Sequence, residues 1–158
     1  MSSQVLRAQV IEEPVLGPWI RFLRAHAAVT RALSARLEST HGLTLSDYDV
    51  LAQLYFAPDH ALRRVDLARQ VLLTASGITR LLDGLERAGW VEKGRCQSDA
   101  RVTYAILTKK GIEKFEAARA THVADIEELF GSRFTAEERD QLAELLARLP
   151  LADTACAE

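Results

Sequence analysis

The side chains best suited to contacting a polyanion lie in two stretches near the middle of the chain. In the first stretch, Ser76, Thr79 and Arg80 fall on the polar side of an expected helix, away from its leucines. Arginine can donate two hydrogen bonds to the edge of guanine, and hydroxyl groups can contact bases or phosphates. Thr74 precedes this helix, where free backbone N–H groups suit a phosphate. The pattern favours a helix that reads DNA; the alternative is an ordinary solvated helix face.

The second stretch, RCQSDARVTYAILT at residues 95–108, is expected to form a hairpin with a polar tip. An arginine at such a tip can enter the minor groove of DNA, where the negative potential is strong over A·T-rich sequence. Asp99 would be repelled by DNA, so we expect it to pair with Arg101 or Arg95 and to hold that guanidinium in place. A plain polar turn is the alternative, because Ser-Asp is common in turns.

Charge is distributed unevenly along a chain whose formal net charge is only −2. Residues 61–114 carry 11 basic and 6 acidic side chains, a net of +5. Residues 1–60 carry 5 basic and 6 acidic side chains, and residues 115–158 carry 4 basic and 10 acidic ones. A basic middle between acidic ends indicates that the middle faces a polyanion.

Hydrophobic periodicity predicts that helices position most of these side chains. The expected helices cover residues 14–41, 46–57, 65–71, 74–88, 109–130 and 135–149, and the expected strands cover 91–96 and 102–107. Gly42 is placed to end the first helix, and Thr108 to begin the long helix after the hairpin. Capping boxes are predicted at Ser46–Asp49 and Thr135–Glu138. Three helices followed by a hairpin are typical of a winged helix-turn-helix.

The segment from residue 76 to residue 111 resembles the signature of the MarR family, the multiple-antibiotic-resistance regulators. The matching motifs are Thr79-Arg80, Leu85-Glu86, Gly89, Asp99-Ala-Arg101, Leu107-Thr108 and Gly111. The resemblance implies a mainly α-helical fold with a small β-hairpin, in a single domain over residues 1–158. It implies a winged helix-turn-helix DNA-binding lobe at 46–108, flanked by dimerisation helices at 14–41 and 109–149.

The same resemblance implies a homodimer that binds double-stranded DNA at a pseudo-palindromic operator, usually as a repressor of adjacent genes. Dimer symmetry should set the two half-sites about one helical turn apart. Apolar stripes along both sets of flanking helices fit such an interface, because a monomer could hardly cover them. The DNA-contacting residues would then be Thr74, Ser76, Thr79, Arg80, Arg95, Asp99 and Arg101.

Many members of this family bind a small aromatic or phenolic anion between the dimerisation helices and the DNA-binding lobe. Aromatic walls with one cation and one polar group would suit an aromatic carboxylate. The residues that we expect to supply them are Trp19, Arg24, His26, Tyr48 and Asp49. The alternative is that the aromatic residues belong to the core and that Arg24 is a surface charge.

Other function classes find less support. No P-loop, GxSxG, HExxH or GxGxxG motif indicates an enzyme, no cofactor is expected, and the four histidines lack metal-ligand spacing. No apolar run is long enough to span a membrane, and the N-terminus lacks a signal-peptide core, so we expect a cytoplasmic protein without membrane contact. Cys96 could respond to oxidation, although a structural role is the simpler expectation, and Cys156 is expected to be incidental. A non-specific architectural DNA protein and a winged-helix protein-interaction module stay open.

Overall fold

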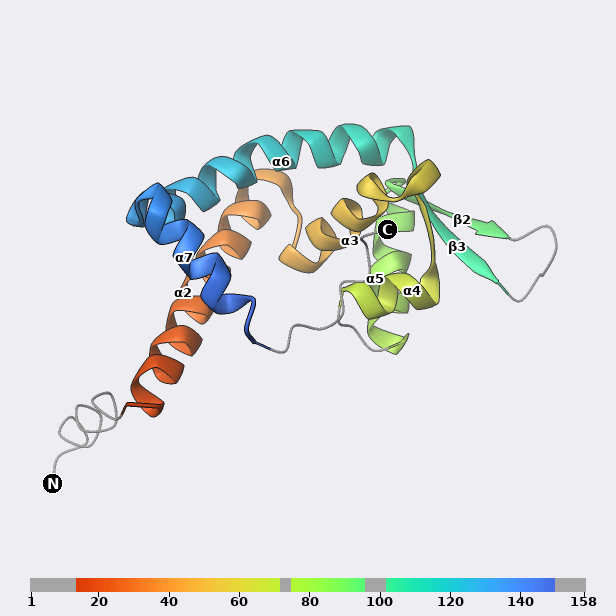
Figure 1. The fold of residues 1–158 in the computed structure, drawn as a ribbon. Coiled ribbons are helices and arrows are strands. Elements are labelled where there is room, and N and C mark those ends of the chain that lie inside the picture. The colour runs from red at the N-terminus through yellow and green to blue at the C-terminus, as the bar shows by residue number, and fades with distance from the viewer. Residues whose placement is uncertain (1–13, 72–74, 96–101, 150–158) are drawn as a thin grey trace, which may run out of the picture.

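Six α-helices and a small sheet make up the part of the chain that the computed structural model describes, which is residues 14–71, 75–95 and 102–149 (Figure 1). The α-helices are α2 (Leu16–His41), α3 (Leu45–Phe56), α4 (Arg64–Gln70), α5 (Ala75–Arg87), α6 (Lys109–Leu129) and α7 (Ala136–Leu146). The strands are β1 (Ala61–Arg63), β2 (Val91–Arg95) and β3 (Thr103–Leu107), and short 3-10 turns cover Pro58–His60 and Gly131–Arg133. The fold class expected from the sequence is therefore confirmed.

The sheet has three strands rather than the two expected, and their order is β1-β3-β2 with both pairs antiparallel. Strand β1 was missed because three residues are too short for an alternating pattern. A tight turn before β1 places this strand beside β3. In the turn, Asp59 and His60 adopt positive φ angles, and the His60 ring nitrogen Nδ1 lies 2.8 Å from the carbonyl oxygen of Tyr55. The three-residue strand then pairs with β3 from Ala61 opposite Ile106 onward.

Side-chain caps fix where the helices begin. Thr108 accepts a hydrogen bond from the Gly111 amide at 3.0 Å, and Thr135 forms the expected capping box with Glu138. The capping box of α3 is Thr44 with Asp47, not the predicted Ser46–Asp49 pair, because Thr44 is the residue that leaves the helix with extended backbone angles. Other boundaries differ from the expected ones by three residues or fewer, because helix and strand ends are weakly encoded.

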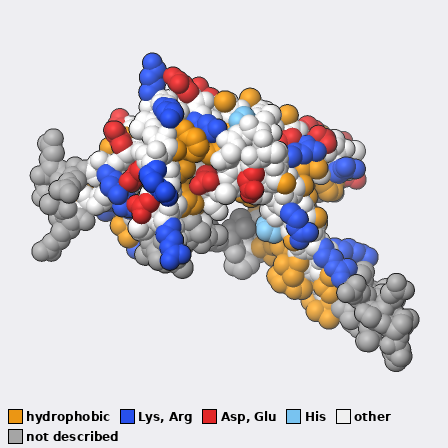
Figure 2. Space-filling view, turned by 180° about the vertical axis from the view of Figure 1, so that it is seen from behind, with side chains coloured by type: hydrophobic (Ala, Val, Ile, Leu, Met, Phe, Trp, Pro, Cys, Tyr) orange, Lys and Arg blue, Asp and Glu red, His pale blue; other side chains and the backbone are white. Residues whose placement is uncertain are grey.

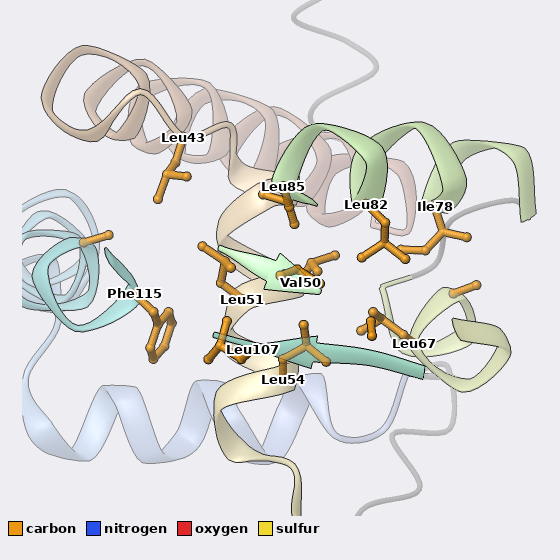
Figure 3. Packing of buried hydrophobic residues seen from close by; sticks show 14 of the residues in the cluster. Leu43, Val50, Leu51, Leu54, Leu67, Ile78, Leu82, Leu85, Leu107 and Phe115 are labelled. Atoms are coloured by element: carbon orange, nitrogen blue, oxygen red, sulfur yellow. The ribbon is translucent and has the colours of Figure 1, made fainter. Parts of the chain in front are cut away.

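One hydrophobic core joins α3, α4, α5, α6 and the sheet (Figure 3). Leu51 and Leu54 of α3 are fully buried, and they share the core with Leu82 of α5 and Phe115 of α6. Burying one such side chain contributes about 1.5–3 kcal/mol. These contacts hold α5 and the hairpin in one lobe.

The long helices α2 and α6 are joined by an ion-paired arginine. Arg36 of α2 donates to Asp125 at 2.7 Å and to Glu128 at 2.8 Å, both on α6. The hydrogen bond from Arg36 lowers the pKa of Glu128 below its ordinary value. Beyond this contact, the N-terminal half of α2 extends away from the lobe beside α7 (Figure 1).

Gly111 provides a stability test of the junction between the hairpin and α6. A Cβ at this position would collide with the backbone carbonyl oxygen of Trp90, which cannot turn aside as a side chain can. Gly111→Ala should therefore lower the free energy of unfolding by about 1–3 kcal/mol, the range of overpacked sites. Gly84→Ala on α5 is the matched control, since a Cβ there meets nothing within 4 Å; it should be neutral or stabilise by up to about 1 kcal/mol. Urea unfolding of both variants measures this, and equal effects would contradict the packing described.

Candidate nucleic-acid interface and effector pocket

Helix α5 has one buried and one exposed side. Ile78, Leu82 and Leu85 are buried in the core, whereas Thr79 and Arg80 are exposed on the other side. Spacing of three and four residues places the apolar set on one helix face. Two of the predicted DNA contacts therefore point outward together. Ser76 lies in the first turn of α5, and Thr74 lies outside the described residues.

The hairpin projects from the lobe beside α5 (Figure 1). Strands β2 and β3 pair from Val91 opposite Leu107 outward to Arg95 opposite Thr103. Arg95 is the last residue of β2, and its role at the hairpin tip stays a prediction. Cys96, Asp99 and Arg101, at the predicted tip, lie outside the described residues, as does Cys156.

A groove of about 350 Å³ lies between α4, α5 and β3. Its lining comprises Arg63, Arg64, Val65, Ala68, Ile78, Thr79, Val102 and Thr103. Neither this groove nor the role of its two arginines was predicted from the sequence. The only hint available was the Arg63-Arg64 doublet in the basic segment, whose position next to β3 depends on the unexpected strand β1.

Salt bridges hold two of the cations near this groove. Arg63 lies 2.6 Å from Asp66. Lys93 of β2 lies 2.8 Å from Glu86 and 3.6 Å from Asp83. The hydrogen bond with Glu86 is the main reason that the pKa of Lys93 is raised. These pairs tie β1 to α4 and β2 to α5.

A second pocket, of about 400 Å³, lies where the start of α3 meets α6. Leu45, Ser46, Tyr48, Asp49 and His122 line it. His122 is only 5% exposed, and its ring centroid lies 4.4 Å from that of Tyr48. The Nδ1 atom of His122 is buried without a hydrogen-bond partner among the described residues. The sequence did not indicate that this histidine lies with Tyr48 and Asp49, because it is on a helix far along the chain.

Burial dominates the electrostatics of that pocket. It raises the pKa of Asp49, against an opposing hydrogen bond with Gln53, and it raises the pKa of Tyr48. It also lowers the pKa of His122, against the attraction of Asp125. All three groups are thereby shifted toward their uncharged forms.

The remaining predicted effector residues lie elsewhere. His26 lines an apolar groove of about 470 Å³ between α2 and α7, which also includes Phe22, Phe130, Phe134 and Leu142. Trp19 stacks beside Phe22 with a centroid distance of 6.2 Å and is 52% exposed. Arg24 is also exposed on α2. The predicted set is therefore divided: Tyr48 and Asp49 share a pocket, and His26 belongs to a separate groove.

Metal binding and membrane insertion find no support in the described parts of the chain. Residues 14–71, 75–95 and 102–149 contain no group of three or more His, Cys, Asp or Glu side chains that could hold a metal ion. Within those same ranges, no helix is long and apolar enough to cross a bilayer.

Comparison with known proteins agrees with this arrangement of lobe and hairpin. A model of the MarR family matches residues 41–102, from the end of α2 into the hairpin. The transcriptional regulator MhqR of Bacillus subtilis is 30% identical over 139 residues, which are 88% of this chain and 93% of that protein. The chain belongs to the MarR family. The resemblance found in the sequence is therefore confirmed, and the function class is transcriptional regulation.

Two further relatives of this MarR-family chain bear on its function. The transcriptional repressor YetL of Bacillus subtilis is 32% identical over 68% of the chain and 64% of that protein. A mutant MarR from Escherichia coli, crystallised in complex with operator DNA, matches with a TM-score of 0.74 at 26% identity. That match covers 89% of this chain and 96% of the other.

His122 predicts a pH dependence of stability. Because burial lowers its pKa in the folded state, the unfolded chain takes up a proton near pH 6.5 more readily than the folded one. The stability that neutral His122 contributes to the folded state should be complete above about pH 6.5. It should be lost as the pH falls toward the lowered pKa of the folded state. The free energy of unfolding should therefore fall more steeply between about pH 7.5 and 5.5 in the parent protein than in His122→Asn. His26→Asn, at an exposed position, is the control; a slope unchanged by His122→Asn would contradict this assignment.

Proposed function

We propose that this MarR-family regulator is a homodimeric, sequence-specific repressor that a small molecule releases from its operator. The observation that carries the proposal is the outward face of α5, where Thr79 and Arg80 are exposed beside a projecting hairpin. A helix presented in this way fits the major groove, and a hairpin next to it fits the adjacent minor groove.

We assign the DNA contacts by chemistry. Arg80 contacts a base edge through its two-pronged guanidinium, and Thr79 and Ser76 contact bases or phosphates. Thr74 and the start of α5 bind phosphate. Arg101 enters the minor groove, Asp99 orients it, and Arg95 binds phosphate or shares Asp99.

The dimer is proposed to form through the arm made by α2, the end of α6 and α7. Figure 2 shows hydrophobic side chains gathered on this projecting arm. On α2, Trp19 is 52% exposed and Phe22 is 40% exposed, and on α6 Val123 is 53% exposed. The exposed set is completed by Val15, Leu16, Leu23, Ile126, Phe130, Leu145 and Leu149. A second copy would remove this apolar surface from water, which the hydrophobic effect favours.

Repression is the mode of action that we propose. The relative YetL is a repressor, and MarR from Escherichia coli was crystallised with operator DNA. A compact dimer bound across a promoter can exclude polymerase without any further domain. We place the protein in the cytoplasm, where its DNA target is accessible.

The effector is proposed to bind the pocket formed by Tyr48, Asp49 and His122. The pocket touches α3, which belongs to the DNA-binding core, and α6, which leads to the dimer arm. Its described lining contains an acid and no arginine or lysine, while Arg119, outside the lining, acts on Tyr48 as a positive charge. An aromatic molecule that carries positive charge or donates hydrogen bonds therefore fits it better than the aromatic carboxylate expected from the sequence.

Variants of two arginines test the DNA-binding assignment. Their affinities are measured on genomic DNA fragments that bind to the parent protein. Arg80→Ala should lose about 1–3 kcal/mol of preference for the operator over scrambled DNA, because one base contact disappears. Arg101→Ala should lower operator affinity about tenfold or more, because a minor-groove contact is lost. Arg87→Ala, at an exposed position in the last turn of α5, is the control for charge on this helix.

The outcomes separate the competing functions. Equal loss on both DNA sequences would make Arg80 a phosphate contact. Equal binding of the parent protein to all sequences would favour a non-specific architectural protein. Absence of binding at low salt would favour a protein-interaction module.

Asp49 tests the effector pocket. Benzylamine should raise the melting temperature and weaken operator binding, because its ammonium group would pair with the Asp49 carboxylate, and ligand binding stabilises the folded state. Asp49→Asn should abolish both responses while keeping operator affinity. Benzoate is the matched anion; if benzoate and not benzylamine gave the responses, the pocket would have the opposite charge preference.

A further inference from the structure

We propose that the groove between α4, α5 and β3 is a seat for one phosphate of the DNA backbone and that Arg64 is the cation that binds it. The proposal rests on the proposed DNA-binding function and adds a contact to it. Arg64 lies at the first position of α4 and lines the groove together with Thr79 of α5 and Thr103 of β3. Two hydroxyl-bearing residues and two arginines, Arg63 and Arg64, thus line a space of about 350 Å³.

Arg64 differs from the other cations around the groove in its pairing. Arg63 is 2.6 Å from Asp66, and Lys93 is 2.8 Å from Glu86. The Nη2 atom of Arg64, in contrast, is buried and has no hydrogen-bond partner among the described residues. A guanidinium stays charged at any physiological pH, and a buried donor without a partner is costly. An anion entering the groove would satisfy it.

The neighbouring charges make the groove attractive to an anion. Arg64 acts on Lys93 as a like charge and opposes the rise in the Lys93 pKa that Glu86 chiefly causes. The carboxylates of Glu86 and Asp66 are engaged by Lys93 and Arg63. Of the two arginines that line the groove in the described part of the chain, Arg63 is therefore engaged by Asp66, whereas Arg64 has a guanidinium nitrogen without a partner.

The position of the groove indicates which anion it meets. If α5 lies in the major groove and the hairpin in the adjacent minor groove, one sugar-phosphate strand must pass between them, because that strand separates the two grooves. The space between α5 and the start of β3, at the outer end of the described hairpin, is the place where that strand would pass. Arginine is also the side chain best matched to phosphate, through parallel hydrogen bonds.

Salt dependence tests this role, because a lost phosphate contact changes it by a known amount. Arg64→Gln should weaken binding to operator and scrambled DNA by the same factor, and the slope of log affinity against log salt should fall by about 1. Arg69→Gln is the matched control: it removes the same charge from the same helix, at a side chain that is 81% exposed. Its slope should equal that of the parent protein, and Arg64→Lys should keep most of the slope.

A phosphate scan locates the contact independently. Single methylphosphonates, which are uncharged, are placed in turn along the operator strand that separates the two contacted grooves. One substitution there should weaken the parent protein but should add nothing to the defect of Arg64→Gln, since both remove the same contact. Inorganic phosphate alone should compete only weakly; strong competition that depends on Arg64 would mean that the groove binds the free anion instead.

Several results would overturn the proposal. An unchanged slope of log affinity against log salt in Arg64→Gln would do so. Affinity losses of Arg64→Gln and of every methylphosphonate that simply add would also do so, as would a loss of affinity for operator DNA alone. If Arg64→Gln does not fold, the methylphosphonate scan is repeated with the folded Arg64→Lys protein. If each methylphosphonate then weakens Arg64→Lys as much as it weakens the parent protein, the contact is rejected. Failure of the parent protein to prefer its operator would reject the proposed sequence specificity, and the slope comparison on any DNA would still decide the role of Arg64.

Discussion

The burial of one face of α5 is the constraint on which the rest of the structure depends. Ile78, Leu82 and Leu85 are held in the same core as Leu51 and Leu54 of α3. Rotating α5 about its axis would expose these side chains at about 1.5–3 kcal/mol each. The outward direction of Thr79 and Arg80 is thus a consequence of apolar packing. The polar contacts of Lys93 with Glu86 and Asp83 then attach β2 to the same helix.

The same core extends to the arm through α6. Phe115 is buried in it, and Ala118 and His122, about one and two turns further along α6, are buried as well. Past that point, Arg36 joins α2 to Asp125 and Glu128. A shift of α6 relative to α3 would therefore be felt at both the arm and the DNA-binding lobe. The pocket of Tyr48, Asp49 and His122 lies at that junction, so a ligand bound there could change the spacing of the two lobes in the proposed dimer.

Features that depend on residues close together in the sequence were predicted, and features that depend on distant residues were not. The amphipathic pattern of α5 and the caps at Thr108 and Thr135 depend on residues a few positions apart, and they were predicted correctly. Strand β1 was missed because its identity comes from pairing with β3, more than 40 residues away. The capping box of α3 was misplaced by two residues because several polar residues there could each cap a helix.

The candidate sites follow the same rule. The exposed Thr79 and Arg80 were found from helix periodicity alone. The effector set was not, because Tyr48 and His122 are 74 positions apart and meet only through the packing of α3 on α6. Arg64 was missed for a similar reason, since only the β1–β3 pairing places α4 beside the hairpin.

The most direct test of the central claim, that two copies of this lobe read DNA together, is a footprint of the protein on the genomic fragment that it binds most tightly. The account predicts two related half-sites whose centres lie about one helical turn apart, with protection of major-groove and adjacent minor-groove positions in each. A single unpaired half-site, or uniform protection without preferred sequence, would contradict it.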